Sequence, residues 1–186
     1  MRVIAGEYRG RVLSAPKKTT FRPTSDRVKE TLFNILAHNY TIEGAEFCDL
    51  FAGSGSIGIE AMSRRASKTS FIENDRTSLA ILKKNLETVS PARPYEIVPI
   101  SVESFLKTVH QQYSILFADP PYAYAKYDEL FDAVMNGEFL TPGGVLVIEH
   151  AGALTFPQRM RDAMRDQRDL GTTKLSFFSN SAEVTP

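Results

Sequence analysis

From Glu46 onward, short apolar runs alternate with amphipathic stretches, a pattern that few folds accommodate. Apolar residues at helical spacing fill the intervals between the runs. Such alternation predicts a doubly wound, mostly parallel α/β sheet. We expect a polar helix around 157–168, a closing strand at 174–178 and a further strand near 168–170. The other predicted strands are 47–51, 69–72, 96–100, 113–118 and 145–149.

The whole chain of 186 residues is expected to form one domain, 1–186, with a basic N-terminal arm at 1–23. Short β-like pieces are predicted at 1–5 and 10–13, and Thr24 or Ser25 is expected to cap a helix. The formal net charge is zero, but residues 1–30 hold eight basic and three acidic groups, a local charge of +5. This asymmetry favours a polyanionic partner. The alternative is a solvated basic face.

Cysteine usage and hydropathy exclude several classes of protein. A single cysteine, Cys48, cannot form an internal disulfide, and no Cys/His spacing indicates a zinc site, so no metal is expected. The N-terminus lacks the apolar stretch of a signal peptide, and no run approaches the length of a membrane span. We expect a cytoplasmic protein that does not enter a membrane.

A glycine loop follows the first predicted strand. Gly53, Gly55 and Gly58 fit the pattern G-x-G-x-x-G, and Glu73 ends the next strand twenty residues after Gly53. Glycines let a backbone approach a ligand, and a carboxylate at that position can accept both ribose hydroxyls. The loop therefore indicates a nucleoside-bearing cofactor. Asp49 would repel a pyrophosphate but could accept the ammonium of S-adenosylmethionine, which favours that cofactor over a dinucleotide.

A second motif, Asp119-Pro120-Pro121-Tyr122, ends the strand at 113–118. Two prolines fix φ and remove two N–H donors, which leaves a stiff turn with outward carbonyls. A carboxylate, a carbonyl and an aromatic face together suit the exocyclic amine of a flat heterocycle. The alternative is a plain strand-ending turn. In a doubly wound sheet, this turn and the glycine loop would be neighbours at the topological switch point.

Six blocks of sequence, in order along nearly the whole chain, resemble the RsmD family of class I S-adenosylmethionine-dependent methyltransferases. Members methylate the N2 amine of a guanine in bacterial small-subunit ribosomal RNA. The first two blocks are specific to the family, whereas the glycine loop is not. The blocks are 2–11, 22–33, 49–55, 71–75, 119–122 and 142–150.

The resemblance implies a seven-stranded sheet whose last strand is antiparallel, and it assigns roles to individual positions. The residues expected at the target amine are Asp119, Pro120, Pro121 and Tyr122. Those expected at the cofactor are Asp49, Phe51, Gly53, Gly55, Glu73, Asn74, Ser101, Val102 and Asp119. Ser101 stands where relatives often have Asp or Asn, and Leu170-Gly171 stands where they often have Tyr-Gly.

Gripping a splayed RNA base requires contacts to the RNA backbone. We assign these contacts to Arg2, Arg9, Arg11, Arg22 and Arg27, and expect a monomer acting on ribosomal RNA or on a 30S assembly particle.

Three alternatives stay open: a nicotinamide-dependent oxidoreductase, a non-catalytic ribosome-assembly factor, and a DNA adenine or cytosine methyltransferase. The last shares the Asp-Pro-Pro-Tyr turn but usually carries a separate target-recognition region.

Overall fold

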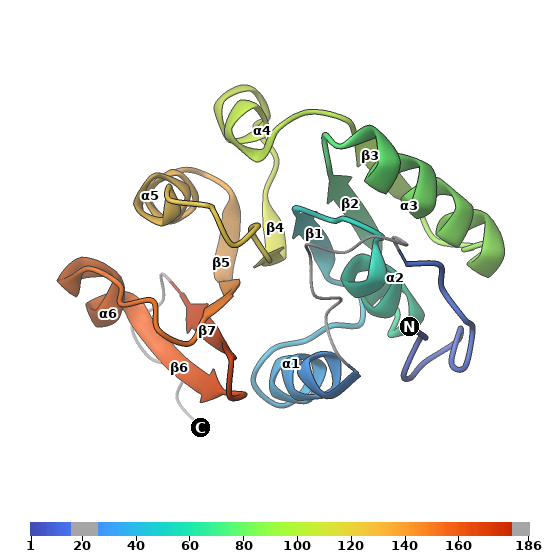
Figure 1. The fold of residues 1–186 in the computed structure, drawn as a ribbon, viewed down its shortest axis with the longest axis horizontal. Helices are drawn as coiled ribbons and strands as arrows, with labels where there is room; N and C mark the ends of the chain where they lie inside the picture. The colour runs from blue at the N-terminus through green and yellow to red at the C-terminus, as the bar shows by residue number, and fades with distance from the viewer. Residues whose placement is uncertain (16–25, 180–186) are drawn as a thin grey trace.

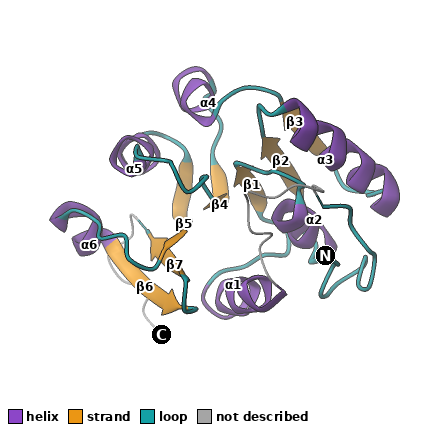
Figure 2. Ribbon diagram, viewed as in Figure 1, coloured by secondary structure: helices purple, strands orange, loops and turns teal. Residues whose placement is uncertain are grey.

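The computed structural model describes residues 1–15 and 26–179. Its centre is a seven-stranded sheet with the order β3-β2-β1-β4-β5-β7-β6 (Figures 1 and 2). All neighbouring pairs are parallel except those made by β7, which runs antiparallel to β5 and β6. The predicted fold class, including the antiparallel last strand, is confirmed. The strands are β1 (Glu46–Leu50), β2 (Lys68–Ile72), β3 (Tyr95–Val98), β4 (Tyr113–Ala118), β5 (Leu140–Ala151), β6 (Met164–Asp169) and β7 (Thr173–Phe178).

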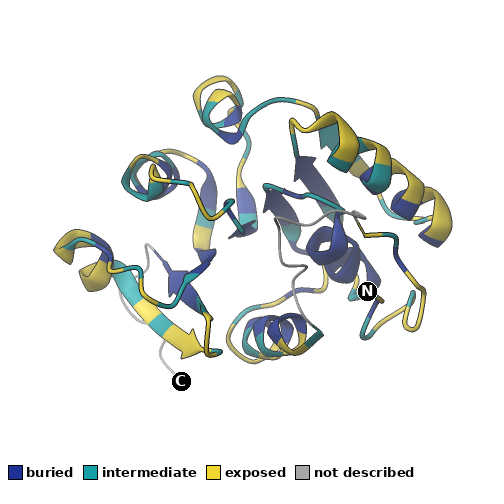
Figure 3. Ribbon diagram, viewed as in Figure 1, coloured by how far each residue is buried: buried dark blue, intermediate teal, exposed yellow. Residues whose placement is uncertain are grey.

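Helices cover both faces of the sheet, so the fold has three layers (Figure 1). Successive side chains of a strand point to opposite faces of the sheet, so alternate residues pack against different helices. Ile115 and Phe117 pack with α1 and α2, whereas Leu116 and Ala118 pack with α4 and α5. Figure 3 shows buried strands between helices whose outer faces are exposed. The helices are α1 (Asp26–Asn39), α2 (Ser56–Ser63), α3 (Arg76–Val89), α4 (Val102–Thr108), α5 (Tyr127–Asn136) and α6 (Gln158–Ala163).

The β-like pieces predicted at 1–5 and 10–13 pair with each other only briefly: Arg2 and Val12 form one isolated antiparallel bridge, and Val3 and Leu13 donate their N–H groups to the carbonyls of Arg11 and Met1, both at 3.0 Å. Gly6 and Gly10, both at φ +82°, interrupt extended backbone between them. The arm packs on α2 and α3, with Val3 and Leu13 in a cluster that also contains side chains of both helices. Figure 1 shows it running along these helices.

A buried charge cluster fixes the start of the arm. Glu60 of α2 accepts the backbone N–H groups of Ile4 (2.7 Å) and Ala5 (3.0 Å) on its two carboxylate oxygens. Lys29 of α1, also fully buried, forms an ion pair with Glu60 at 3.6 Å and donates to the carbonyl of Arg2. The arm is therefore part of the folded core, because removing it would leave a buried charge without its amide donors.

Two further predictions near the C-terminus need correction. The helix expected over 157–168 ends at Ala163, and the strand expected near 168–170 is β6, from Met164 to Asp169. This edge strand exposes most of its side chains, so it lacks the apolar signal of a buried strand. β5 is irregular near its start, where Gly143 has φ +77° and the register with β4 shifts.

Thr24, Ser25 and Arg22 lie outside the described residues, so the predicted helix cap and one predicted RNA contact fall there. Over 1–15 and 26–179, no helix is long and apolar enough to cross a membrane.

Candidate active site

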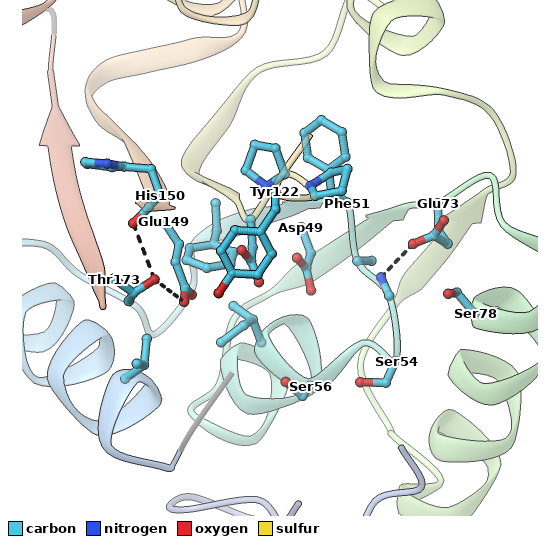
Figure 4. A pocket seen from close by; sticks show the side chains of 18 of the residues that line it. Asp49, Phe51, Ser54, Ser56, Glu73, Ser78, Tyr122, Glu149, His150 and Thr173 are labelled. Atoms are coloured by element: carbon cyan, nitrogen blue, oxygen red, sulfur yellow. Dashed lines mark hydrogen bonds between the residues drawn. The ribbon is translucent and has the colours of Figure 1, made fainter. Parts of the chain in front are cut away.

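A cleft of about 940 Å³ opens at the carboxyl ends of the parallel strands (Figure 4). Its lining comes from the segments that follow β1, β2 and β4 and from the end of β5. The neighbouring positions of β1 and β4 place the glycine loop and the proline turn in one cleft, as the sequence predicted. The predicted residues that line it are Asp49, Phe51, Gly53, Glu73, Asn74, Asp119, Pro120, Pro121, Tyr122 and Arg27.

Glu73 organises the glycine loop through backbone donors. Gly53 donates its N–H to Oε2 of Glu73 at 2.8 Å, and Asn74 and Asp75 donate theirs to Oε1, also at 2.8 Å. A carboxylate has about four acceptor sites, so Glu73 can still accept a hydroxyl from the cleft. The hydrogen bond to Gly53 is drawn in Figure 4.

The three glycines of the loop serve different purposes. Gly53 has φ +55° and an open side, so its backbone is available to a ligand. Gly55 does not line the cleft; a Cβ there would lie 2.3 Å from Leu82, and one at Gly58 would lie 2.3 Å from the ring of Phe71. These two glycines are required for packing of the loop and α2.

Asp49 is 2% exposed at the end of β1 and accepts the N–H of Gly58 at 2.9 Å. Burial, with a smaller contribution from the charges of Asp119 and Glu73, raises the pKa of its carboxyl to about 8. At neutral pH the carboxyl therefore keeps its proton unless a cation lies beside it. This environment fits the ammonium group of S-adenosylmethionine and would oppose a pyrophosphate.

Ser101 and Val102 are not among the residues that line the cleft. Ser101 is the N-cap of α4, where its hydroxyl accepts the N–H of Ser104 at 3.2 Å. Val102 is buried in the core beneath α4 and α5. Ser101 nevertheless follows the end of β3 by three residues, on the edge of the sheet where the cleft opens.

The proline turn presents its aromatic ring to solvent. Tyr122 is 65% exposed at the cleft, which excludes a role as a core aromatic, while Pro120 is buried. The aromatic residue that packs against the core is Tyr124. Its ring makes edge-on contacts with the rings of Phe51 and Tyr127, with 5.1 Å and 5.3 Å between the ring centroids. Tyr122 is therefore available to stack on a planar ligand.

The described arginines of the basic arm are all exposed. Arg2 forms an ion pair with Asp26 at 3.2 Å. Arg27, in α1, is also exposed and lines the cleft. No group of three or more His, Cys, Asp or Glu side chains in the described part of the chain could hold a metal ion.

The sequence interpretation missed Glu149 and Thr173, which also line the cleft. His150 is the next residue, but its ring points away from the cleft and contacts Phe156, with 4.6 Å between centroids (Figure 4). Strand parity at the end of β5 could have found Glu149, because Val147 and Glu149 share a face.

The topology and the cleft define the class: this is a class I S-adenosylmethionine-dependent methyltransferase. A family model described as "conserved hypothetical protein 95" matches residues 1–179. Ribosomal RNA small subunit methyltransferase D of Haemophilus influenzae is 40% identical over 152 residues, 80% of this chain and 78% of that protein. Its Escherichia coli K12 namesake is 38% identical over 149 residues, 80% and 74% of the two chains. The chain belongs to the RsmD family.

Solved structures agree with this assignment. The Escherichia coli protein yhhF superposes with a TM-score of 0.83 at 32% identity, covering 98% of this chain and 99% of the other. The hypothetical protein TTHA0928 of Thermus thermophilus gives the same TM-score at 28% identity, covering 96% and 98%.

Proposed function

We propose that this protein transfers a methyl group from S-adenosylmethionine to the exocyclic N2 amine of a guanine in small-subunit ribosomal RNA. One observation carries the proposal: the Asp119-Pro120-Pro121-Tyr122 turn lines the same cleft as the glycine loop and Asp49. The names of the Haemophilus influenzae and Escherichia coli relatives support a ribosomal RNA substrate. A nicotinamide-dependent oxidoreductase leaves the proline turn unused.

Three groups of the β1 and β2 ends would hold the cofactor. The buried carboxyl of Asp49 would accept its ammonium, and the remaining acceptor site of Glu73 would take a ribose hydroxyl. The open backbone of Gly53 allows close approach between them. When bound, S-adenosylmethionine supplies an electrophilic methyl group on a sulfonium.

The turn after β4 would hold and orient the nucleophile. An aromatic amine is a poor nucleophile because its lone pair delocalises into the ring. Hydrogen bonds from its two N–H groups to the Asp119 carboxylate and the Pro120 carbonyl favour a pyramidal nitrogen and direct its lone pair. In the reaction an N–C bond forms, the C–S bond breaks, and the nitrogen loses a proton to Asp119 or to water. Alignment accounts for much of the rate, since oriented partners reach effective molarities of about 10⁵ M or more.

Recognition of the RNA combines stacking with backbone contacts. The exposed ring of Tyr122 would stack on the base that has left its helix. Arg9, Arg11 and Arg27 are exposed and would contact phosphates, together with Arg2 once it exchanges its partner Asp26. The protein would act as a monomer, on RNA or on a 30S assembly particle.

Asp119→Ala tests the assignment. The wild type should methylate small-subunit RNA, either naked or in 30S particles, at one guanine N2 that mass spectrometry can map. In the variant, methyl transfer should fall by orders of magnitude while S-adenosylhomocysteine still raises the melting temperature. Asp162→Ala, an exposed aspartate of α6 outside the cleft, is the matched control and should keep full activity. Near-normal turnover of Asp119→Ala would contradict the role of the turn.

Thermal shift also separates the cofactor classes. S-adenosylhomocysteine should raise the melting temperature of the wild type, whereas NADH should not. A shift with NADH alone would refute the proposed cofactor.

A further inference from the structure

Glu149 stands next to the proline turn on the neighbouring strand. The last paired residues of β4 and β5 are Ala118 and Ile148, so Asp119 and Glu149 each lie one residue beyond the same pair. Adjacent strands are about 5 Å apart, and residues at matching positions of a parallel pair share a face. Both residues line the cleft. The sheet therefore sets two carboxylates side by side, one of which belongs to the amine-binding turn.

The position of Glu149 is rigid and its side chain is enclosed. β5 continues past it, and Glu149 is paired with Leu175 of β7. The side chain is only 8% exposed and points into the cleft (Figure 4). Thr173 donates its hydroxyl toward Oε1 of Glu149 at 3.5 Å and toward the carbonyl of His150 at 3.3 Å. Held in this way, the carboxyl oxygens of Glu149 can accept a hydrogen bond from a ligand in the cleft.

The strand order tells which ligand this acceptor faces. The cofactor elements follow β2 and β1, the proline turn follows β4, and Glu149 belongs to β5. Moving along the sheet from the glycine loop, Glu149 therefore lies beyond Asp119, on the side of the cleft away from Glu73. A group on this side contacts the base whose amine the turn holds, not the cofactor.

The bases that carry an exocyclic amine differ in the atom next to it. In guanine, the N2 amine is flanked on the Watson–Crick edge by N1–H, which is a donor. In adenine and cytosine, the corresponding ring nitrogens, N1 and N3, are acceptors. A carboxylate beside the amine-binding turn would bond the guanine edge and repel the lone pair of the other two.

We propose that Glu149 accepts the N1–H of the target guanine and selects this base against adenine and cytosine. The inference rests on the proposed function and adds a specificity-determining residue to it. It also supplies a physical distinction from the DNA methyltransferases that share the Asp-Pro-Pro-Tyr turn: the selecting group is one side chain of β5. Thr173 positions that carboxylate through its hydroxyl.

Substitution of the target base tests the proposal on the wild-type protein. The probe is the RNA substrate in which the methylated guanosine is replaced by 2-aminopurine riboside, which keeps the 2-amine but has an acceptor at N1. The kcat/KM for guanine should exceed that for 2-aminopurine by at least about tenfold, since a buried acceptor would lose its donor. Equal rates on the two RNAs would overturn the proposal without any variant.

Glu149→Gln then assigns the selectivity to this residue. A glutamine amide can accept from guanine N1–H or turn to donate to N1 of 2-aminopurine, so the ratio of the two kcat/KM values should fall by about tenfold. The matched control is Glu138→Gln, an exposed glutamate outside the cleft, which should keep the wild-type ratio. An unchanged ratio in Glu149→Gln would overturn the proposal, as would loss of S-adenosylhomocysteine binding, which would place Glu149 at the cofactor. A wild type inactive on all small-subunit RNA would instead refute the proposed function itself.

Discussion

Replacing Asp49 by asparagine should stabilise the ligand-free protein increasingly as the pH rises. Burial raises the pKa of this carboxyl from 3.8 to about 8. The folded state thus keeps a proton that the unfolded chain loses. The stability from this proton is complete below about pH 4 and is lost as the pH rises through 8. Between pH 5 and pH 8 the loss is about three units at 1.36 kcal/mol each, or roughly 4 kcal/mol.

Urea unfolding of the wild type and Asp49→Asn at pH 5 and pH 8 measures this term. Groups far from Asp49 titrate equally in both proteins, so the difference between their free energies of unfolding reports Asp49 together with its coupling to Asp119 and Glu73. An asparagine oxygen can still accept the N–H of Gly58, which makes the variant a fair comparison. A difference that stays constant from pH 5 to pH 8 would refute the reasoning.

The same carboxyl should couple ligand binding to proton release. It must ionise to hold an ammonium, so with a pKa of about 8 the wild type should release close to one proton on binding S-adenosylhomocysteine at pH 7. Calorimetry in two buffers of different ionisation enthalpy counts this proton, and affinity should fall by about tenfold per unit below pH 8. Asp49→Asn should bind weakly and release almost none. Equal proton release by the two proteins would show that Asp49 does not meet the cation.

The remaining predictions concern the cleft mouth and the arm. Tyr122→Ala should lower kcat/KM for RNA by about 5- to 160-fold, because stacking contributes ~1–3 kcal/mol, whereas Tyr122→Phe should retain activity; an alanine variant with wild-type activity would exclude stacking. Arg9→Ala and Arg11→Ala should each make the slope of log affinity for RNA against log salt concentration shallower by about 0.7–0.9, without lowering the melting temperature. An unchanged slope would show that the residue does not contact the RNA. Asn85→Ala should lower the free energy of unfolding by about 2–4 kcal/mol, because the buried Asn85 side chain forms hydrogen bonds with the backbone of both Ser14 and Ser54. Urea unfolding measures this loss, and a loss of less than about 1 kcal/mol would contradict the prediction.

The strands with the clearest sequence signal are those buried on both faces. β1, β4 and the core of β5 are continuous apolar runs, and the cleft-forming turns follow from where these runs end. β6 could not be found in the same way, because an edge strand with exposed charges has neither an apolar run nor a clean alternation. The two β-like pieces of the arm were predicted and pair through a single bridge, but their docking on Glu60 of α2 was not, because no local pattern encodes that contact.

The residues of the candidate site also differ in whether a local sequence pattern marks them. Asp49, Glu73 and Asp119 were predicted because each ends a recognisable strand beside a glycine or proline motif. Strand parity puts Glu149 on the face of Val147, but no such motif marks it, and its proximity to Asp119 depends on the register of β5 against β4, which is a tertiary property. Ser101 was placed by position in the family pattern, but its hydroxyl is used locally to cap α4.

The contacts of the arm have a consequence for the order of folding. Ile4 and Ala5 bond Glu60, which lies 56 and 55 residues further along the chain, and Ser14 bonds Asn85, 71 residues further. During synthesis the arm therefore leaves the ribosome well before its partners exist, and its docking closes large loops. We expect the arm to join late, after α2 and α3 have formed, so that the basic surface reaches its final shape only when the cofactor loop is already built.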